Sequence, residues 1–273
     1  SIQGLTLWRC RASVWHTGPM SSCKRKILLA LSCGVILSGV VILGGCERPS
    51  GPAAVSAPGP DDWTRLPAIE QVEVSPSGLL AKGTTEPLGR VVLRQDQGQA
   101  YAVSADAQGR FSLPFRRPGQ DAIFFVESQL GQDSISAGYA LFVAAQSEAP
   151  VARIELGRAT VRLDRRGGLE AFDSDGVVVI ASGSAGQDGD IQMRVEDGPT
   201  MAITADKSGR WEQVISPAGA GPLSVTVQGR VHQYPGSGQS LAEGLYQEPG
   251  GWRLVWSTDR NTRQETWFPE LSD

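Results

Sequence analysis

Cysteine is missing from most of this chain. The 273 residues contain four cysteines, and all of them lie within the first 46 positions: Cys10, Cys23, Cys33 and Cys46. Residues 47–273 therefore cannot form a disulfide among themselves, a cysteine zinc site or a cysteine nucleophile. Any domain in that part of the chain has to be stabilised by apolar burial and strand pairing.

Histidine is almost as scarce, because only His232 occurs beyond the first 46 residues. Catalysis by a serine nucleophile generally needs a base held nearby, and no Gly-x-Ser-x-Gly motif accompanies this histidine. We predict no catalytic residue and no enzyme activity, and we interpret His232 as an ordinary residue of a strand.

The acidic residues do not form a recognisable calcium loop. Asp173-Ser174-Asp175-Gly176 and Asp188-Gly189-Asp190 could offer oxygen ligands, but their spacing does not match the 12-residue calcium-binding loop. Asp-Gly pairs are common in turns. We therefore predict turns at both places, and we expect neither a metal nor a cofactor.

The first 46 residues contain a basic segment followed by an apolar one. Lys24, Arg25 and Lys26 precede the apolar run 27–43, which ends in Leu43-Gly44-Gly45 directly before Cys46. This pattern resembles the lipobox of bacterial lipoproteins. The resemblance implies cleavage after Leu43-Gly44-Gly45, a diacylglycerol on the thiol of Cys46 and acylation of the new amino terminus.

Two alternatives to a lipoprotein signal stay open, an uncleaved membrane anchor and an ordinary cleaved signal. The apolar run is near the lower limit of about 17 to 25 residues for a spanning helix. The small residues before Cys46, and the lack of a basic cluster after it, favour the lipoprotein interpretation. Glu47 follows the cysteine where aspartate would favour inner-membrane retention in enterobacterial lipoproteins. We therefore expect a lipid-anchored envelope protein, at the outer membrane rather than the inner one, on its periplasmic or surface face.

The leader divides the N-terminal part into three segments. Because Met20 stands immediately before the basic segment, we interpret residues 1–19 as upstream sequence outside the fold. Residues 20–45 are the predicted signal peptide. Residues 46–68 are the predicted lipidated cysteine and flexible tether, since they are rich in proline, glycine, alanine and serine.

Charge excludes one class of partner. Removing the five basic residues before Cys46 leaves 20 basic against 29 acidic residues, a net charge of −9. This balance disfavours nucleic acid and anionic lipid surfaces. The expected membrane contact is the N-terminal lipid, and the expected partner is another envelope protein.

An internal repeat with an offset of 100 residues organises the rest of the chain. The segment SADAQGRF at 104–111 recurs as TADKSGRW at 204–211, and ten of the 31 positions from 81 to 111 are identical in this register. Each copy shows short alternating runs separated by Gly-containing turns, which is typical of antiparallel strands. The Asp106-to-Gly109 and Asp206-to-Gly209 turns recur in both copies, so we predict a structural role for them and for Arg110 and Arg210.

The motifs PLGRVVL at 87–93 and ADAQGRF at 105–111 resemble bacterial Ig-like and carboxypeptidase-regulatory-like β-sandwich modules. The resemblance implies a fold of about seven strands per copy and no active site, since such modules usually serve as spacers, adhesive units or glycan-contacting accessories. The predicted fold class is all-β, with two tandem Ig-like antiparallel β-sandwiches at 69–149 and 150–230. Residues 151–163 are predicted to open the second.

Residues 231–273 are predicted to be an aromatic-rich hairpin packed on the second domain, or a small third unit. Trp252, Leu254 and Trp256 should share one strand face, with Arg253 on the other. Residues 231–273, which we call the tail, are compatible with either of two functions. If Trp252, Trp256 and Trp267 fill a core, the protein is a structural or adaptor element; if they are exposed, they form a platform for glycan or peptidoglycan.

Overall fold

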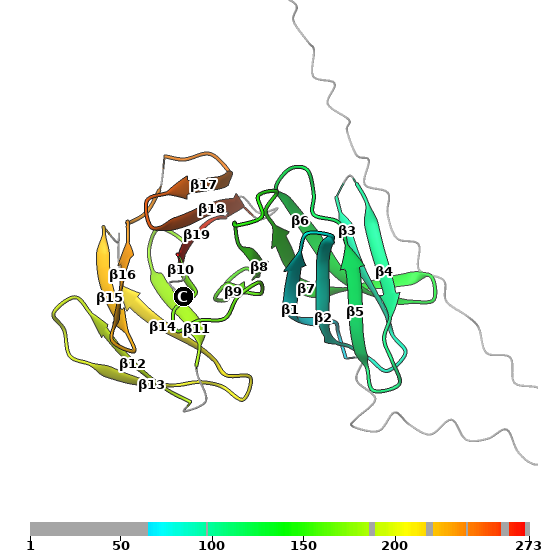
Figure 1. Cartoon of the computed structure of the whole chain (residues 1–273), viewed down its shortest axis with the longest axis horizontal. Coiled ribbons are helices and arrows are strands. Elements are labelled where there is room, and N and C mark those ends of the chain that lie inside the picture. Colours follow the sequence, from blue (N-terminus) through cyan, green and yellow to red (C-terminus); the bar gives the residue numbers. More distant parts are fainter. Residues whose placement is uncertain are drawn as a thin grey trace, which may run out of the picture. The chain divides into compact units, whose positions relative to one another are not determined.

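The computed structural model describes residues 65–96, 98–185, 189–216, 221–238, 240–257 and 262–270. In these ranges the regular secondary structure is β-strand throughout, arranged in four sheets whose neighbouring strands are all antiparallel (Figure 1). The prediction of an all-β antiparallel fold is confirmed. The described strands all belong to one compact unit.

Two sheets in the first half of the chain pack over a shared core. The smaller sheet has the order β1-β2-β5, and the larger has the order β4-β3-β6-β7-β8-β9. The core contains side chains from both, among them Val72, Ala81, Leu93, Phe124 and Leu141. The strands are β1 (Ala68–Ser75), β2 (Gly78–Thr84), β3 (Arg90–Gln95), β4 (Ala100–Ser104), β5 (Arg110–Phe115), β6 (Ala122–Leu130), β7 (Asp133–Val143), β8 (Val151–Ile154) and β9 (Val161–Arg162).

The second half contains two further sheets with their own core. Their orders are β14-β11-β10-β19-β18-β17 and β13-β12-β15-β16. Phe172, Ile191, Trp211, Val225 and Trp267 are buried between them. The strands are β10 (Ala171–Ser174), β11 (Val179–Ser184), β12 (Asp190–Val195), β13 (Met201–Thr204), β14 (Arg210–Ser216), β15 (Leu223–Val227), β16 (Arg230–Tyr234), β17 (Gly244–Glu248), β18 (Gly251–Ser257) and β19 (Arg263–Pro269).

The sequence repeat is also a repeat of strand pairing. The arrangement β1-β2-β5 recurs as β10-β11-β14, and β4-β3-β6-β7 recurs as β13-β12-β15-β16. The register recurs as well, since Gly83 lies opposite Phe111 and Gly183 lies opposite Trp211. Each copy therefore contributes three strands to one sheet and four to the other.

The repeated aspartates form the predicted turns. Asp106 Oδ1 accepts hydrogen bonds from the backbone N–H groups of Gln108 (2.9 Å) and Arg110 (2.8 Å). Asp206 Oδ1 accepts the equivalent bonds from Ser208 (2.8 Å) and Arg210 (2.9 Å). The backbone N–H of Arg110 lowers the pKa of Asp106, and the hydroxyl of Ser208, followed by the backbone N–H of Arg210, lowers the pKa of Asp206.

The structure corrects the predicted start of the second domain. Residues 151–163 are predicted to open it, but β8 pairs with the end of β7, with Val151 opposite Val143 and Ile154 opposite Ala140, and β9 pairs with β8. Strands adjacent in sequence pair readily across a short connection, here residues 144–150. These residues therefore extend a sheet of the first half.

The aromatic tail joins the second half. Strands β18 and β19 form a hairpin, with Trp252 opposite Phe268 and Arg253 opposite Trp267. Strand β19 then pairs with β10, so that Phe172 lies opposite Trp267. The strands β17, β18 and β19 enlarge one sheet of the second half and do not form a separate unit.

Gly83 and Gly183 occupy equivalent positions in the two copies of the repeat, and at both the neighbouring backbone approaches closely. A Cβ atom at Gly183 would lie 2.1 Å from the carbonyl oxygen of Gly168, and one at Gly83 would lie 2.0 Å from that of Ala68. Backbone cannot yield as a flexible side chain can, so we expect Gly183→Ala and Gly83→Ala each to lower the free energy of unfolding by at least about 2 kcal/mol. Chemical denaturation measures this change.

The matched control for this test is Gly119→Ala, where a Cβ would have no neighbour within 4 Å. We expect that variant to remain within about 0.5 kcal/mol of the parent. Equal stability of all three variants would contradict the described strand spacing.

Candidate functional site

The predicted lipid attachment site lies outside the described residues. Leu43, Gly44, Gly45 and Cys46 all precede residue 65, where the description begins. Among the described residues, none belongs to a helix with the length and apolar character needed to cross a membrane.

The three tail tryptophans are buried. The exposed fraction is 6% for Trp252, 8% for Trp256 and 1% for Trp267. Trp252 and Trp256 belong to a third core, where they are clustered with Phe142 of β7 and Ile154 of β8. Trp267 belongs instead to the core of the second half.

This burial argues against the predicted glycan platform. Rings with so little exposed surface cannot stack on a sugar in this conformation. The physical reason is that β18 is covered on both faces. Trp252, Leu254 and Trp256 point into the third core as the alternation predicted, while Arg253 lies on the other face with its guanidinium 5.6 Å from the ring centroid of Trp267.

Arg253 is the centre of a buried ion-pair cluster. Its guanidinium donates to Glu248 Oε1 (2.8 Å), to Glu265 Oε2 (3.3 Å) and to the carbonyl oxygen of Gly236 (2.8 Å). Burial alone would lower the pKa of Arg253, but the hydrogen bond and charge of Glu248, together with the charge of Glu265, raise it. The cluster ties β17, β18 and β19 to the loop after β16.

A second buried polar cluster surrounds Asp173 on β10. Thr160 donates to this carboxylate from its backbone N–H (2.7 Å) and its hydroxyl (2.6 Å), and the hydroxyl of Thr266 on β19 donates as well (2.7 Å). Ser182 donates to the carbonyl oxygen of Thr160 (3.1 Å). Burial raises the pKa of Asp173 to about 6, although the threonine hydrogen bonds oppose this change.

The remaining candidates are the acidic residues considered as calcium ligands and His232. Asp175 Oδ1 accepts hydrogen bonds from the backbone N–H groups of Val177 and Val178, both at 2.8 Å, so it forms a turn as predicted. Asp188 is not among the described residues. Burial, and then the charge of Arg230, lower the pKa of the half-buried His232. The described ranges contain no group of three or more His, Cys, Asp or Glu side chains arranged to hold a metal ion.

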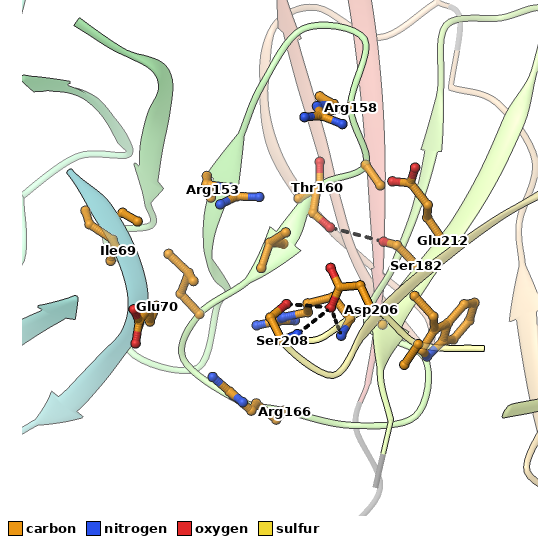
Figure 2. A pocket seen from close by; sticks show the side chains of 18 of the residues that line it. Ile69, Glu70, Arg153, Arg158, Thr160, Arg166, Ser182, Asp206, Ser208 and Glu212 are labelled. Atoms are coloured by element: carbon orange, nitrogen blue, oxygen red, sulfur yellow. Dashed lines mark hydrogen bonds between the residues drawn. The ribbon is translucent and has the colours of Figure 1, made fainter. Parts of the chain in front are cut away.

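A cleft of about 640 Å³ lies between β1, the segment 158–161 and the second copy of the repeat (Figure 2). Four arginines line it: Arg153, Arg158, Arg166 and Arg210. Sequence reasoning missed this cleft. The sequence does indicate a basic region here, because five arginines lie within residues 153–166 of a chain whose acidic residues outnumber its basic ones.

Arg210 departs from its counterpart in the first copy. Arg110 Nε pairs with Asp106 of its own turn at 3.3 Å on the surface. Arg210 instead forms an ion pair with the buried Glu170 and donates to the carbonyl oxygen of Arg162 (3.1 Å). Burial lowers the pKa of Arg210; Glu170 opposes this effect, while the nearby charges of Arg166 and Arg153 add to it.

A second cleft of about 480 Å³ has Arg166 in its lining, as the first cleft does. Its other basic residues are Arg230 and His232, and its described lining contains no acidic side chain.

A comparison with known protein-family models finds no match, and a comparison with curated proteins finds none either.

Replacing Trp256 by alanine tests its place in the third core. Truncating a buried tryptophan removes its contacts and leaves a cavity, so we expect Trp256→Ala to lower the free energy of unfolding by about 3 to 5 kcal/mol. The control is Val231→Ala, because Val231 is 61% exposed and its truncation should cost less than about 0.5 kcal/mol. An unchanged melting temperature together with lost retention on envelope glycans would restore the platform hypothesis.

The raised pKa of Asp173 predicts a pH dependence of stability. The folded state holds this proton more tightly than the unfolded state does, with a pKa of about 6 against 3.8. The stability contribution of Asp173 is therefore greatest below pH 4 and decreases as the pH rises to 6, by about 3 kcal/mol in total. We expect the unfolding free energy of the parent, minus that of Asp173→Asn, to fall by this amount between pH 4 and pH 7.

Asp175→Asn is the control for the pH experiment, because backbone hydrogen bonds lower the pKa of Asp175. A carboxylate with a lowered pKa loses its stabilising effect only when the pH falls, so the corresponding difference should not decrease between pH 4 and pH 7. A constant difference for Asp173→Asn would show that this carboxylate titrates normally.

Proposed function

We propose that this chain is a non-catalytic lipoprotein of the bacterial cell envelope that acts as a structural or adaptor element through two Ig-like modules. The observation that carries the proposal is the burial of the tail aromatics. Trp252 and Trp256 of the second half pack in one core with Phe142 and Ile154 of the first half. A protein whose largest side chains make such a junction is built to hold two modules in a fixed arrangement.

The strand arrangement supports the Ig-like assignment of each copy. Three strands form one sheet and four form the other, and the two sheets share a core in each half. Seven antiparallel strands in two facing sheets are the architecture of constant-type Ig domains. Ig-like modules commonly act as spacers or binding units, and the repeat of such a module in one chain suits both roles.

Hydrogen bonds add to the junction between the halves. The guanidinium of Arg162 on β9 donates to the carbonyl oxygen of Pro269 on β19 (3.4 Å), and the carbonyl oxygen of Arg162 accepts a hydrogen bond from Arg210 on β14 (3.1 Å). These bonds and the apolar core oppose bending between the modules. With a lipid on Cys46 and a flexible tether up to residue 68, the paired modules would stand away from the membrane as one body and present their surfaces to a protein partner.

Glycan binding through Trp252, Trp256 and Trp267 was the alternative function. Their low exposed fractions remove its main support, and we do not propose it for these residues.

The proposal is tested by expressing the full chain with an affinity tag at its C-terminus in a bacterial host. We expect intact mass spectrometry to find cleavage before Cys46 and an added mass that corresponds to a diacylglycerol and an acyl chain. The variant Cys46→Ser should lose this modification and leave the membrane fraction. An unmodified thiol at Cys46 in the membrane fraction would contradict the lipoprotein assignment.

The adaptor role is tested in the same cells by cross-linking before purification. A structural or adaptor lipoprotein should be recovered with the same envelope protein in a fixed ratio, and Cys46→Ser should lose that partner through mislocalisation. Recovery of the lipidated protein without a reproducible partner would contradict an adaptor role.

A further inference from the structure

The two clefts share Arg166 in their linings, and we call them together the arginine groove. Its arginines are Arg153, Arg158, Arg166, Arg210 and Arg230. Figure 2 shows Arg153, Arg158 and Arg166 around the larger cleft, each from a different part of the segment that joins the two copies of the repeat. The groove is unusual because the chain that carries it is acidic, with 29 acidic against 25 basic residues even when the leader is counted.

Arg153, Arg158 and Arg166 keep positive charge facing the larger cleft, whereas the charge of Arg210 is paired with the buried Glu170. Arg153 has its guanidinium carbon 5.3 Å from the ring centroid of Tyr139, a contact that leaves its charge uncompensated. Arg158 has only a loose, exposed pairing with Glu155 at 3.7 Å. Arg166 is exposed, and it lies close enough to Arg210 for their charges to interact. Several guanidinium groups that repel one another create a favourable site for an anion.

The larger cleft also contains carboxylates, and these restrict the kind of anion. Glu70, Asp206 and Glu212 line it together with the arginines. Asp206 Oδ1 is occupied by the amides of its own turn, while Glu70 accepts a single hydrogen bond from Thr84 (3.1 Å). A ligand of uniformly high negative charge would be repelled by these groups. A ligand that alternates negative groups with hydroxyl groups would use both, because hydroxyls donate hydrogen bonds to carboxylates.

We propose that the arginine groove binds an acidic polysaccharide, with its arginines pairing with the carboxylates of the sugar acids. The planar guanidinium matches a carboxylate with two parallel hydrogen bonds. The sugar hydroxyls would donate to Glu70 and Glu212 and would exchange hydrogen bonds with polar side chains of the lining, such as Thr204 and Ser208. Clefts of 640 and 480 Å³ lie in the size range of small-ligand sites and together accommodate several sugar units.

The lining chemistry disfavours the two other polyanions that a basic groove could take. Single-stranded nucleic acid is usually held by exposed aromatic rings, whereas the only ring from Phe, Tyr or Trp in the described lining of the groove is Trp211, which is 4% exposed. Polyphosphate carries a high charge density and offers almost no hydrogen-bond donors to Glu70 and Glu212. The proposal concerns a surface separate from the lipid anchor and does not depend on the proposed adaptor role.

The test measures binding of an oligogalacturonate to the full chain by calorimetry at low salt. We expect Arg166→Glu to weaken binding roughly tenfold or more, since it reverses a charge that faces both clefts. The matched control is Arg116→Glu, which makes the same change at an exposed arginine of the first half and should weaken binding less than about twofold. Arg158→Glu provides a second groove variant if Arg166→Glu does not fold.

A spectroscopic readout locates the ligand. The chain has two histidines, so the ring proton signal of His232 can be assigned by its loss in His232→Gln. We expect oligogalacturonate to move this signal and a neutral oligosaccharide of equal length to leave it in place. Equal weakening by the groove and control variants would overturn the site, and equal or tighter binding of polyphosphate would overturn the assignment to an acidic polysaccharide.

Discussion

The packing of β18 between two cores is the constraint on which the rest of the structure depends. One face of the strand carries Trp252, Leu254 and Trp256 into the core shared with β7 and β8, and the opposite face carries Arg253 toward Trp267. A strand covered on both faces has no solvent available for its polar groups, so every charge on it needs a partner inside the protein. The pairing of Arg253 with Glu248 and Glu265 follows from this requirement. The same packing makes one unit out of two modules that could otherwise have moved independently.

The buried polar groups near the junction specify how the segments meet. Asp173 accepts hydrogen bonds from Thr160 and Thr266, residues that lie 13 and 93 positions away in the sequence. Arg210 connects the turn of the second copy to Glu170 and to the carbonyl of Arg162. Such bonds are directional, whereas apolar contacts are not, and an unsatisfied buried partner is costly. They therefore favour this single arrangement of the junction over other packings of the same apolar surfaces.

The parts of the fold that depend on local periodicity could be predicted from the sequence. The repeated Asp106 and Asp206 turns and the alternation along β18 both follow from spacing within short segments. The partner of a segment could not be predicted in the same way. Residues 151–154 alternate as a strand should, but alternation does not say which of two sheets the strand joins. The tail tryptophans posed the same difficulty, because a stripe of aromatic residues has the same pattern whether it faces solvent or a second module. The arginine groove was not predicted because its lining comes from residues up to 164 positions apart, Ala68 to His232, and only the five arginines within residues 153–166 indicated it.

The third core joins the two modules, and for this reason we expect them to unfold as one unit. Native-state hydrogen exchange at increasing denaturant concentration tests it most directly, with the amides of β7 in the first half and β12 in the second as the probes. If the junction couples the halves as the packing of Phe142 against the tail tryptophans indicates, the slowest amides of both strands should converge on one opening free energy. Two separate opening free energies, with one half exchanging through its own unfolding while the other stays protected, would contradict it.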